Sequence, residues 1–600
     1  MPSIMGAKMN TFLSYVVAVV RDPYLFEFNP KISDFQKEAD KQHKRQHKSP
    51  AFFNTVPHDA RGHNTCYEAL YVLLNYLHHI TNFFMFIVLV QHLGIQMVNV
   101  FAILYCFQEI VILAPVYAIS RVAHVSLTRL IQGGRPLSFV AYAWTYILLS
   151  LIVTTVVAAL CTLLRDTLLS YLLGDLAPWC LKVYMTSVWI DATVVTVSIC
   201  MQHILMAEER SVLLLGALAA KEFAKIFVFI VYIFYLSMSM ARNASYWTGE
   251  FNESIKLPTS EFFHDAILYS TKPGDVSSAT TMQELMLLLN PHYIQQENSE
   301  ASQLIMKVHL YSYHISILFS SCTFILVSAC LLAYRTREMG WAHYKKDPIV
   351  VSCTPFMYGL LVLFSDGKGL VATIKHLVIS WIPVYLDRIS ILVPLLTMCI
   401  TSRQQIMAAE RSTLKMMQLT LFRLLYDTYN SLSLSIVELF TAAIVRAHTE
   451  HAYKIEVRIK RCVMILCIVL SVGCYPVMIR LNKVVTIFKQ FNYNWLTPVE
   501  KLWIDEIYNN SGTLVMQDVN NVLIGAHTLL VMHLLMDQKI ITIYLLSLAR
   551  FFFCFILMFS SIKSPTSRFT SIQELAICNI IMSIISVLGL ILSSSKYDIS

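Results

Sequence analysis

The sequence contains few charged residues for its length. Asp, Glu, Lys and Arg make up 14% of its 600 residues, whereas soluble domains carry about 25%. Hydrophobic residues account for 56%, and they fall in long runs. A soluble protein has no core that could bury so many apolar side chains. The composition therefore excludes a soluble globular protein and predicts a polytopic membrane protein.

Several motifs that carry chemistry are also missing. The chain has no G-x-x-x-x-G-K-[ST] loop, which excludes a nucleotide-driven pump. It has no C-x-x-C pair, and none of its 14 cysteines lies in the predicted external loops 241–310 and 483–512, so neither a cysteine metal site nor an external disulfide framework is expected. We predict a protein that is not an enzyme, with no cofactor, no metal site and no nucleic-acid partner.

Apolar segments long enough to span a bilayer recur along the chain. About 20 apolar residues cross the hydrocarbon region as a helix, in which every backbone polar group is satisfied internally. The pattern predicts an all-α protein with 12 transmembrane helices, at 67–90, 97–122, 138–164, 181–206, 212–238, 311–334, 376–400, 416–443, 462–482, 513–536, 540–562 and 572–595.

Two independent signals orient these helices. Lys and Arg gather in "KISDFQKEADKQHKRQHKSP" before the first span, in "YRTREMGWAHYKKDP" after the sixth and in "YKIEVRIKRC" after the eighth. The positive-inside rule places these segments in the cytoplasm. The three N-x-[ST] sequons, at Asn243, Asn252 and Asn509, then fall in external loops, where glycosylation is possible. Both signals favour the same topology, and they predict a glycoprotein.

One further apolar segment, "IVVSCTPFMYGLLVLFS" at 349–365, is almost long enough to span. If it crossed the bilayer, every later loop would change sides. The basic segment after the eighth span would then lie outside and Asn509 inside, against both signals. We therefore interpret 349–365 as an interfacial or partly buried helix.

The chain contains an internal repeat. Residues 203–229 align with 533–559 without a gap, with nine identities in 27 positions, where composition alone gives about two or three. Each copy starts at the cytoplasmic end of one helix and returns as the next, and the copies are six helices apart. This predicts two parallel six-helix lobes, an arrangement typical of transporters. The alternative is a pair of similar hairpins without common descent.

The repeat and the charge pattern together predict the organisation of the chain. We refer below to the two halves as the N-lobe and the C-lobe. The predicted parts are a basic cytoplasmic tail at 1–66, the N-lobe at 67–334 with a long external loop at 239–310, a cytoplasmic linker at 335–375, the C-lobe at 376–595 and a cytoplasmic end at 596–600.

Ionisable residues lie deep within the predicted spans, where an isolated charge costs a few kcal/mol. The residues at depth are Glu109, Asp191, Lys221, Glu222, Lys225, Asp387, Arg388, Arg423, Asp427 and Arg550, with Asp518, Asn520 and Asn521 at the start of span ten. A carboxylate in a wet cavity binds either a proton or Na⁺ or a cationic substrate, and this competition produces antiport. The alternative is that the charges only pair with one another, as the spacing of Arg423 and Asp427 allows.

The architecture resembles that of the multidrug and toxic compound extrusion (MATE) transporters. "VLVQHLGIQMVNVFAI" resembles the short external turn after their first helix, and "RLIQGGRP" is similar to their Gly-rich turn between helices two and three. "LVISWIPVYLDRISILVPLL" resembles their seventh helix, with a proline at Pro383. The chain departs from the family in having only 17 glycines and in its long loop 239–310, so the resemblance implies a divergent member.

The resemblance implies acidic coupling residues on particular helices. Asp191, Asp387, Asp427 and Asp518 match the family's acidic positions by helix and depth, whereas the acid on helix one has no counterpart. We expect these four to bind the coupling cation or proton. The substrate cavity is expected to include Glu109, Lys221, Arg388, Asn521 and Arg550.

The predicted function is export of organic cations, drugs or metabolites by antiport with H⁺ or Na⁺ through alternating access of two lobes. One alternative is a flippase of the same fold for lipid-linked oligosaccharides, with a cationic cavity built from Lys221, Lys225, Arg388 and Arg550. Another is a membrane receptor or scaffold that binds through its external loop. The expected partners are the lipid bilayer and a cationic small molecule. The expected form is a monomer in the plasma membrane or an internal secretory or vacuolar membrane.

Overall fold

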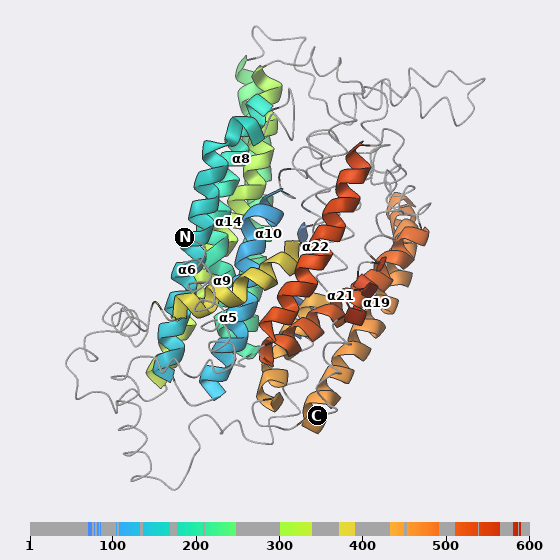
Figure 1. The fold of residues 1–600 in the computed structure, drawn as a ribbon. Coiled ribbons are helices and arrows are strands. Elements are labelled where there is room, and N and C mark those ends of the chain that lie inside the picture. The colour runs from blue at the N-terminus through green and yellow to red at the C-terminus, as the bar shows by residue number, and fades with distance from the viewer. Residues whose placement is uncertain are drawn as a thin grey trace, which may run out of the picture.

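The fold was determined as a computed structural model (Figure 1). Every secondary-structure element among its described residues is helical. The structure describes residues 107–132, 136–168, 177–207, 211–247, 300–338, 373–389, 433–448, 453–490, 511–537 and 539–563, with residue 371 and scattered positions in 70–104 and 580–589.

The helices form two groups that lie side by side, with the N-lobe helices on the left of Figure 1 and the C-lobe helices on the right. Residues 373–389, in yellow, lie between the groups. The N-lobe elements are η3 (Glu109–Leu113), α5 (Ala114–Gln132), α6 (Pro136–Leu163), α8 (Ala177–Ile190), η5 (Asp191–Val195), α9 (Thr196–Ala207), α10 (Ser211–Trp247) and α14 (Glu300–Glu338). The C-lobe elements are α19 (Tyr453–Gln490), α21 (Ser511–Met536) and α22 (Ile540–Lys563), with helical residues at 433–448.

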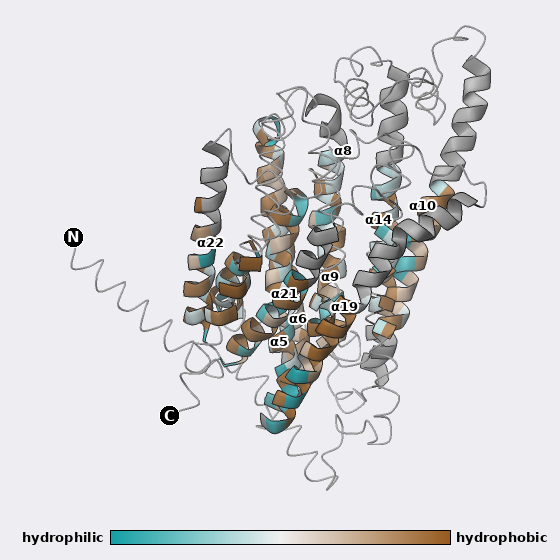
Figure 2. Ribbon diagram, turned by 90° about the vertical axis from the view of Figure 1, so that its right-hand side faces the viewer, coloured by the Kyte–Doolittle hydropathy of each residue, from teal (hydrophilic) through white to brown (hydrophobic). Residues whose placement is uncertain are grey.

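Five helical stretches in the described residues are long and apolar enough to cross a membrane. Large apolar side chains on helix surfaces are exposed, among them Leu163 at 80% and Phe223 at 71%. Buried positions, by contrast, include charged groups such as Lys225 and Asp387. Figure 2 shows hydrophobic residues along most of the coloured helix length and hydrophilic ones at the lower end of α19. This inside-out distribution fits helices surrounded by lipid, so the chain is an integral membrane protein.

Predicted and observed helices agree closely at several spans. The predicted spans 513–536 and 540–562 correspond to α21 and α22. The second span differs, because its helix continues ten residues beyond the predicted end at 122 to Gln132. The added turns carry polar residues on one face, and His124 and Thr128 are buried there against other helices. The polar residues of these turns lower the average hydropathy, so the predicted span ended before them. The helix continues because other helices rather than lipid cover this polar face.

Two helices widen by a π-helical turn. Glu109 begins η3 ahead of α5, and Asp191 begins η5 between α8 and α9. At the second turn, the Thr196 hydroxyl donates to the Asp191 carbonyl at 3.0 Å, and Thr154 of α6 donates to the Ala192 carbonyl at 2.9 Å. These bonds satisfy carbonyls that the wider turn leaves without a regular helical partner. Single π turns often mark functional positions, and both of these begin at an acidic residue.

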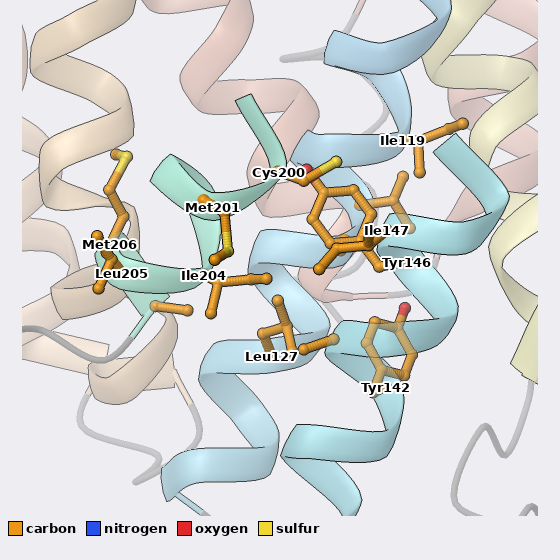
Figure 3. Close-up of a cluster of buried hydrophobic side chains, with 14 of the residues drawn as sticks. Ile119, Leu127, Tyr142, Tyr146, Ile147, Cys200, Met201, Ile204, Leu205 and Met206 are labelled. Atoms are coloured by element: carbon orange, nitrogen blue, oxygen red, sulfur yellow. The ribbon is translucent and has the colours of Figure 1, made fainter. Parts of the chain in front are cut away.

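The main apolar core joins α5, α6 and α9, as Figure 3 shows. Leu127 of α5, Tyr146 of α6 and Ile204 of α9 belong to it. Tyr146 also donates from its hydroxyl to Ser120 Oγ at 2.6 Å, so its polar atom is satisfied within the core. The three helices therefore share a tightly packed apolar core.

The same core continues into the C-lobe. Leu534, Leu535 and Ile543, at the end of α21 and the start of α22, belong to one cluster with Met206 and Leu214 of the N-lobe. These positions lie at the helix ends that the charge pattern predicts to be cytoplasmic. The Arg129 side chain of α5 adds a hydrogen bond from Nη2 to the Met536 carbonyl at 2.5 Å. The two lobes are thus packed together at these ends.

Candidate functional site

A buried polar network links the first span to α10. The Glu222 carboxylate lies 2.5 Å from His78 Nδ1 and 2.7 Å from Lys225 Nζ. Lys225 Nζ also donates to Asn82 Oδ1 at 3.0 Å. Glu222 and Lys225 are three residues apart and so share one face of α10, whereas Phe223 points outward. The network is a charged pair with neutral donors around it, held between two helices.

Lys221, which the sequence assigns to the substrate cavity, has a different neighbour. Its Nζ lies over the Phe324 ring of α14, 5.4 Å from the ring centroid. A cation at this distance is stabilised by the negative face of the ring. Lys221 and Lys225 therefore both interact electrostatically with Glu222, but only Lys225 forms an ion pair with it, and Lys221 packs on Phe324.

Asp191 is the most informative carboxylate of the N-lobe. Only 7% of the residue is exposed. The Gln108 amide donates to its Oδ2 at 2.8 Å and accepts from the Ser187 hydroxyl. In the described part of the chain, no Lys, Arg or His nitrogen lies within ion-pair distance of Asp191, and its charged neighbour is a second carboxylate, Glu109. The structure thus brings together two residues, Glu109 and Asp191, that the sequence assigns to the cavity and to coupling respectively.

Asp387 of the seventh span belongs to a buried triad in the C-lobe. His527 Nε2 of α21 lies 2.8 Å from Asp387 Oδ1, and Arg550 Nη1 of α22 lies 3.9 Å from the same oxygen. The exposed fractions of these three side chains are only 4%, 2% and 7% for His527, Asp387 and Arg550. A small cavity of about 10 Å³ adjoins the triad, and Ser547 also lines it. One water molecule needs about 10–15 Å³, so the cavity has room for a single water or small ion and not for a drug-sized ligand.

Arg388 points away from its neighbour Asp387, as adjacent helical positions require. Its guanidinium carbon lies 5.0 Å from the centroid of the Tyr117 ring of α5. Glu438, in the helix at 433–448, interacts electrostatically with both Arg388 and Arg121 of α5. These contacts place cations and a carboxylate where the two lobes meet. Arg121 and Glu438 are additions to the sequence-based set.

The remaining predicted positions divide into described and undescribed residues. Asn521 is fully buried and donates to Ser471 Oγ of α19 at 2.7 Å, and Asn520 accepts from Ser583 at 3.1 Å. Asp518 lies in α21, whose side chains are described only from residue 519. Asp427 lies outside the described residues. Of the three sequons, Asn243 lies near the end of α10, and Asn252 and Asn509 lie outside the described residues.

The structure supports the repeat through two histidine pairs. The rings of His124 and His203 are 5.7 Å apart, and those of His448 and His533 are 6.2 Å apart. His203 and His533 are equivalent in the alignment, and each lies near the end of its helix. The same offset of 330 residues matches Asp191 with Asn521. His203 and His533 therefore each pair with a second histidine of their own lobe, although His124 and His448 are not aligned with each other, and the C-lobe has a neutral Asn521 where the N-lobe has Asp191.

Sequence reasoning missed three partners in these networks: His78, His527 and Glu438. His527 and Glu438 lie in apolar stretches and His78 lies in the polar segment NYLHHITN at 75–82, and only the packing of distant helices brings each of them to a charge. The one available signal was their predicted depth in the membrane, which makes a polar side chain a candidate in its own right. The predicted cavity residues Lys221 and Arg550 lie on different lobes and have separate partners.

Comparison with known proteins identifies the fold. No family model and no curated sequence matches the chain. It is similar to a MATE protein crystallised with MaL6, at 11% identity and a TM-score of 0.55 over 90% of this chain and 97% of the other. It is also similar to the eukaryotic MATE transporter AtDTX14, at 11% identity and a TM-score of 0.56 over 89% and 95%.

A third similar structure is a transporter of the MOP superfamily from Pyrococcus furiosus, described with a binding pocket of reverse polarity. It shares 10% identity and a TM-score of 0.51 over 89% of this chain and 96% of the other. These likenesses show that the chain has the MATE fold, the predicted all-α membrane architecture of two six-helix lobes.

Proposed function

We propose that this protein is a secondary active transporter that exports organic cations, drugs or metabolites in exchange for H⁺ or Na⁺. The proposal rests on the MATE fold and on one observation above all, the environment of Asp191. The similar proteins AtDTX14 and the Pyrococcus furiosus protein are described as transporters. The charges of this chain are the features that favour cation exchange.

Asp191 supports the proposal because its carboxylate has no compensating charge among the described residues. It is buried, it accepts from the neutral amide of Gln108, and its charged neighbour is Glu109. The ionised form of a carboxyl group in such surroundings is strongly disfavoured unless it binds a cation. Without a bound cation, the group favours the protonated form. The pair of Glu109 and Asp191 is thus suited to hold a proton, Na⁺ or a cationic substrate, and these would compete for it.

Asp387 supports the proposal in a different way. Its carboxylate already contacts two side chains that carry or accept positive charge, His527 and Arg550. A mobile cation that enters the adjoining pocket would compete with these tethered groups. The C-lobe triad would then change its contacts as the ion arrives and leaves. Coupling through Asp387, with Asp427 and Asp518 as the other expected acids, is part of the proposal.

The packing of the lobes supports alternating access. The shared apolar core and the bond from Arg129 to Met536 hold the lobes together at the ends predicted to be cytoplasmic. Charged groups such as Arg388 and Glu438 lie deeper, at the same interface. Export requires these ends to separate, so that a substrate can reach the interface from the cytoplasm.

The flippase alternative needs cations that converge on one cavity. Lys221 and Lys225 lie on α10 of the N-lobe, whereas Arg388 and Arg550 lie in the C-lobe. Each of the four already contacts a carboxylate or an aromatic ring, so phosphate binding would have to break those contacts. The Pyrococcus furiosus protein nevertheless shows that this fold accommodates pockets of opposite polarity. A receptor or scaffold would have no need for the uncompensated carboxylate at Asp191.

Reconstitution in lipid vesicles tests the proposal. Vesicles with a fluorescent organic cation inside receive a pH gradient, a Na⁺ gradient or neither, and a parallel set carries a fluorescent lipid-linked sugar in one leaflet. The proposal predicts cation release that depends on one gradient, with no movement of the lipid. Gradient-independent movement of the lipid alone would support the flippase. Movement of neither compound would support the receptor or scaffold.

A further inference from the structure

A second group of charged side chains lies at the end of the C-lobe that is predicted to face the cytoplasm, about 9 Å along α21 from His527 of the buried triad. His448 comes from the end of helix 433–448, Glu456 from the first turn of α19 and His533 from the last turn of α21. Asp537 follows α21 directly. Two consecutive helices, 433–448 and α19, and the more distant α21 therefore bring two imidazoles and two carboxylates together.

The distances in this cluster match those between ligands of one small metal ion. His448 Nδ1 lies 3.2 Å from Glu456 Oε2, and His533 Nδ1 lies 3.5 Å from Glu456 Oε1. The ligand atoms of His448, Glu456 and His533 all lie within 4.8 Å of one another. Ligands bound tetrahedrally at about 2.0–2.1 Å are about 3.3 Å apart. The three residues thus need only a small movement to bind one ion.

The other nitrogens of the two histidines face Asp537. His448 Nε2 lies 3.5 Å from Asp537 Oδ1, and His533 Nε2 lies 3.6 Å from Asp537 Oδ2. Histidines that bind a metal typically direct their second nitrogen at a carboxylate, which fixes the tautomer and the ring orientation. In this cluster one carboxylate serves both rings. Glu456 is therefore placed as a ligand and Asp537 as the group that orients both histidines.

The amino group of Lys460 contacts two of the proposed ligands. Lys460 Nζ contacts Glu456 Oε1 and lies 2.9 Å from His533 Nδ1. Its ammonium group thus touches two of the atoms that a metal ion would bind. A metal ion would have to displace it, and the lysine would act as a tethered competitor. This contact shows that the cluster accepts a positive charge at that place.

The accessibility of the ligands also fits an ion from the cytoplasm. Glu456 lies outside the predicted span 462–482. The two histidine side chains are 20% and 26% exposed. An ion can reach them without crossing the bilayer.

The N-lobe provides a natural control. The N-lobe residue His203, which the repeat aligns with His533, pairs with His124 in the middle of α5, and both are buried. Each ring of this pair contacts the other, and neither forms an ion pair with a carboxylate in the residues that the structure describes. Among the described residues, only the C-lobe pair has carboxylates within ion-pair distance of its rings.

We propose that His448, Glu456 and His533 form a binding site for a divalent transition metal of the Zn²⁺ class, with Asp537 orienting the histidines and Lys460 opposing the ion. Two imidazole nitrogens and a carboxylate are ligands that Zn²⁺, Co²⁺ and Ni²⁺ favour over Mg²⁺ or Ca²⁺. An ion there would fasten the end of α21 to α19, one residue from Met536, which accepts the bond from Arg129 of the N-lobe. The absence of closely spaced cysteine ligands led to the prediction of no metal site, whereas the ligands proposed here are up to 85 residues apart, from His448 to His533.

Co²⁺ binding to the purified full-length protein tests the site. Co²⁺ replaces Zn²⁺ and has a visible absorbance band that reports a tetrahedral site with nitrogen ligands. The protein is titrated after removal of any histidine tag. The parent is expected to bind one Co²⁺ with this band, and Zn²⁺ is expected to abolish it. His448→Ala and His533→Ala should lose the band, whereas His124→Ala should keep it.

Two further variants give graded results that do not depend on losing a ligand. Asp537→Asn should weaken Co²⁺ binding by about 10–100-fold, the usual effect of removing an orienting carboxylate. Lys460→Gln should strengthen binding several-fold, because the competing ammonium is gone. A band that survives in both C-lobe histidine variants, or falls equally in His124→Ala, would indicate adventitious binding and overturn the proposal. So would a folded Lys460→Gln protein that binds Co²⁺ no more tightly than the parent.

Discussion

His527 of α21 and Asp387 of the seventh predicted span are in contact inside the C-lobe, with His527 Nε2 only 2.8 Å from Asp387 Oδ1. Neither residue would make this contact by sequence proximity, since 140 positions separate them. Arg550 adds a third helix to the same carboxylate oxygen at 3.9 Å. The Asp387 carboxylate, which the sequence analysis assigned to cation coupling, thus contacts one positively charged side chain, Arg550, and one that can become positive, His527.

Replacement of Asp387 tests whether the triad couples transport or only stabilises the fold. Asp387→Asn keeps the size of the side chain but leaves Arg550 buried without its carboxylate. We expect gradient-driven cation release to fall at least tenfold, with thermal stability lowered because the buried cation is uncompensated. The double variant Asp387→Asn, Arg550→Gln should recover stability but not transport. If it recovers both, the triad has a structural role alone.

The pair of Glu222 and Lys225 on α10 allows a separate test of stability. Lys225→Met leaves the Glu222 carboxylate buried without its ion-pair partner on α10, and we expect a loss of about 3–5 kcal/mol in the free energy of unfolding. Glu222→Gln combined with Lys225→Met removes both charges and should restore most of that loss. Thermal melting of all the variants in one detergent measures the coupling. Additive effects of the two substitutions would contradict a direct ion pair.

Gly525 of α21 is expected to be needed for close helix packing. A Cβ at this position would lie 3.3 Å from Cys467 Sγ of α19 and 3.3 Å from Ser433 Cβ. We expect Gly525→Ala to destabilise the protein by about 1–3 kcal/mol through overpacking. Gly216→Ala in α10 is the matched control, since a Cβ there meets nothing within 4 Å. That control should be neutral or stabilising by up to about 1 kcal/mol, because alanine favours a helix.

Arg129 tests the closure of the lobes. Its Nη2 donates to the carbonyl oxygen of Met536, and Met536 is the last residue of α21. Arg129→Ala should loosen the ends predicted to be cytoplasmic, so that a cysteine introduced at Leu535 reacts faster with a membrane-impermeant thiol reagent. The comparison uses the same introduced cysteine in both proteins, with the exposed Cys322, Cys330 and Cys462 replaced by serine, since these would react with the reagent as well. Equal rates in both backgrounds would show that this bond does not hold the lobes closed.

The fold could be predicted from sequence because it depends on features that are local or periodic. Long apolar runs gave the helices, and the alignment of 203–229 with 533–559 gave the two lobes. In the structure, the aligned residues His203 and His533 each pair with a second histidine of their own lobe. Helix ends were less predictable. The last turns of α5 are half polar, and packing against protein rather than lipid is what makes them helical.

The partners of the buried charges could not be predicted, since they depend on how distant helices meet. The sequence placed Asp191 and Asp387 at depth but gave no sign that Gln108 would contact the first and His527 the second. It likewise missed the cluster at His448, because a search for closely spaced ligands overlooks residues at three separate helix ends. Their predicted depth in the membrane was the only signal in the sequence that these buried charges had in common.

The most direct test of cation exchange compares two aspartates on the N-lobe. Asp191 is buried and has no compensating cation among the described residues, whereas the Asp166 side chain is 81% exposed and contacts only the adjacent Arg165. Release of a fluorescent organic cation from vesicles is measured under the gradient that drives the parent. We predict that Asp191→Asn abolishes gradient-driven release and that Asp166→Asn leaves it within twofold of the parent. Full release by a folded Asp191→Asn protein would contradict the proposed role of this carboxylate.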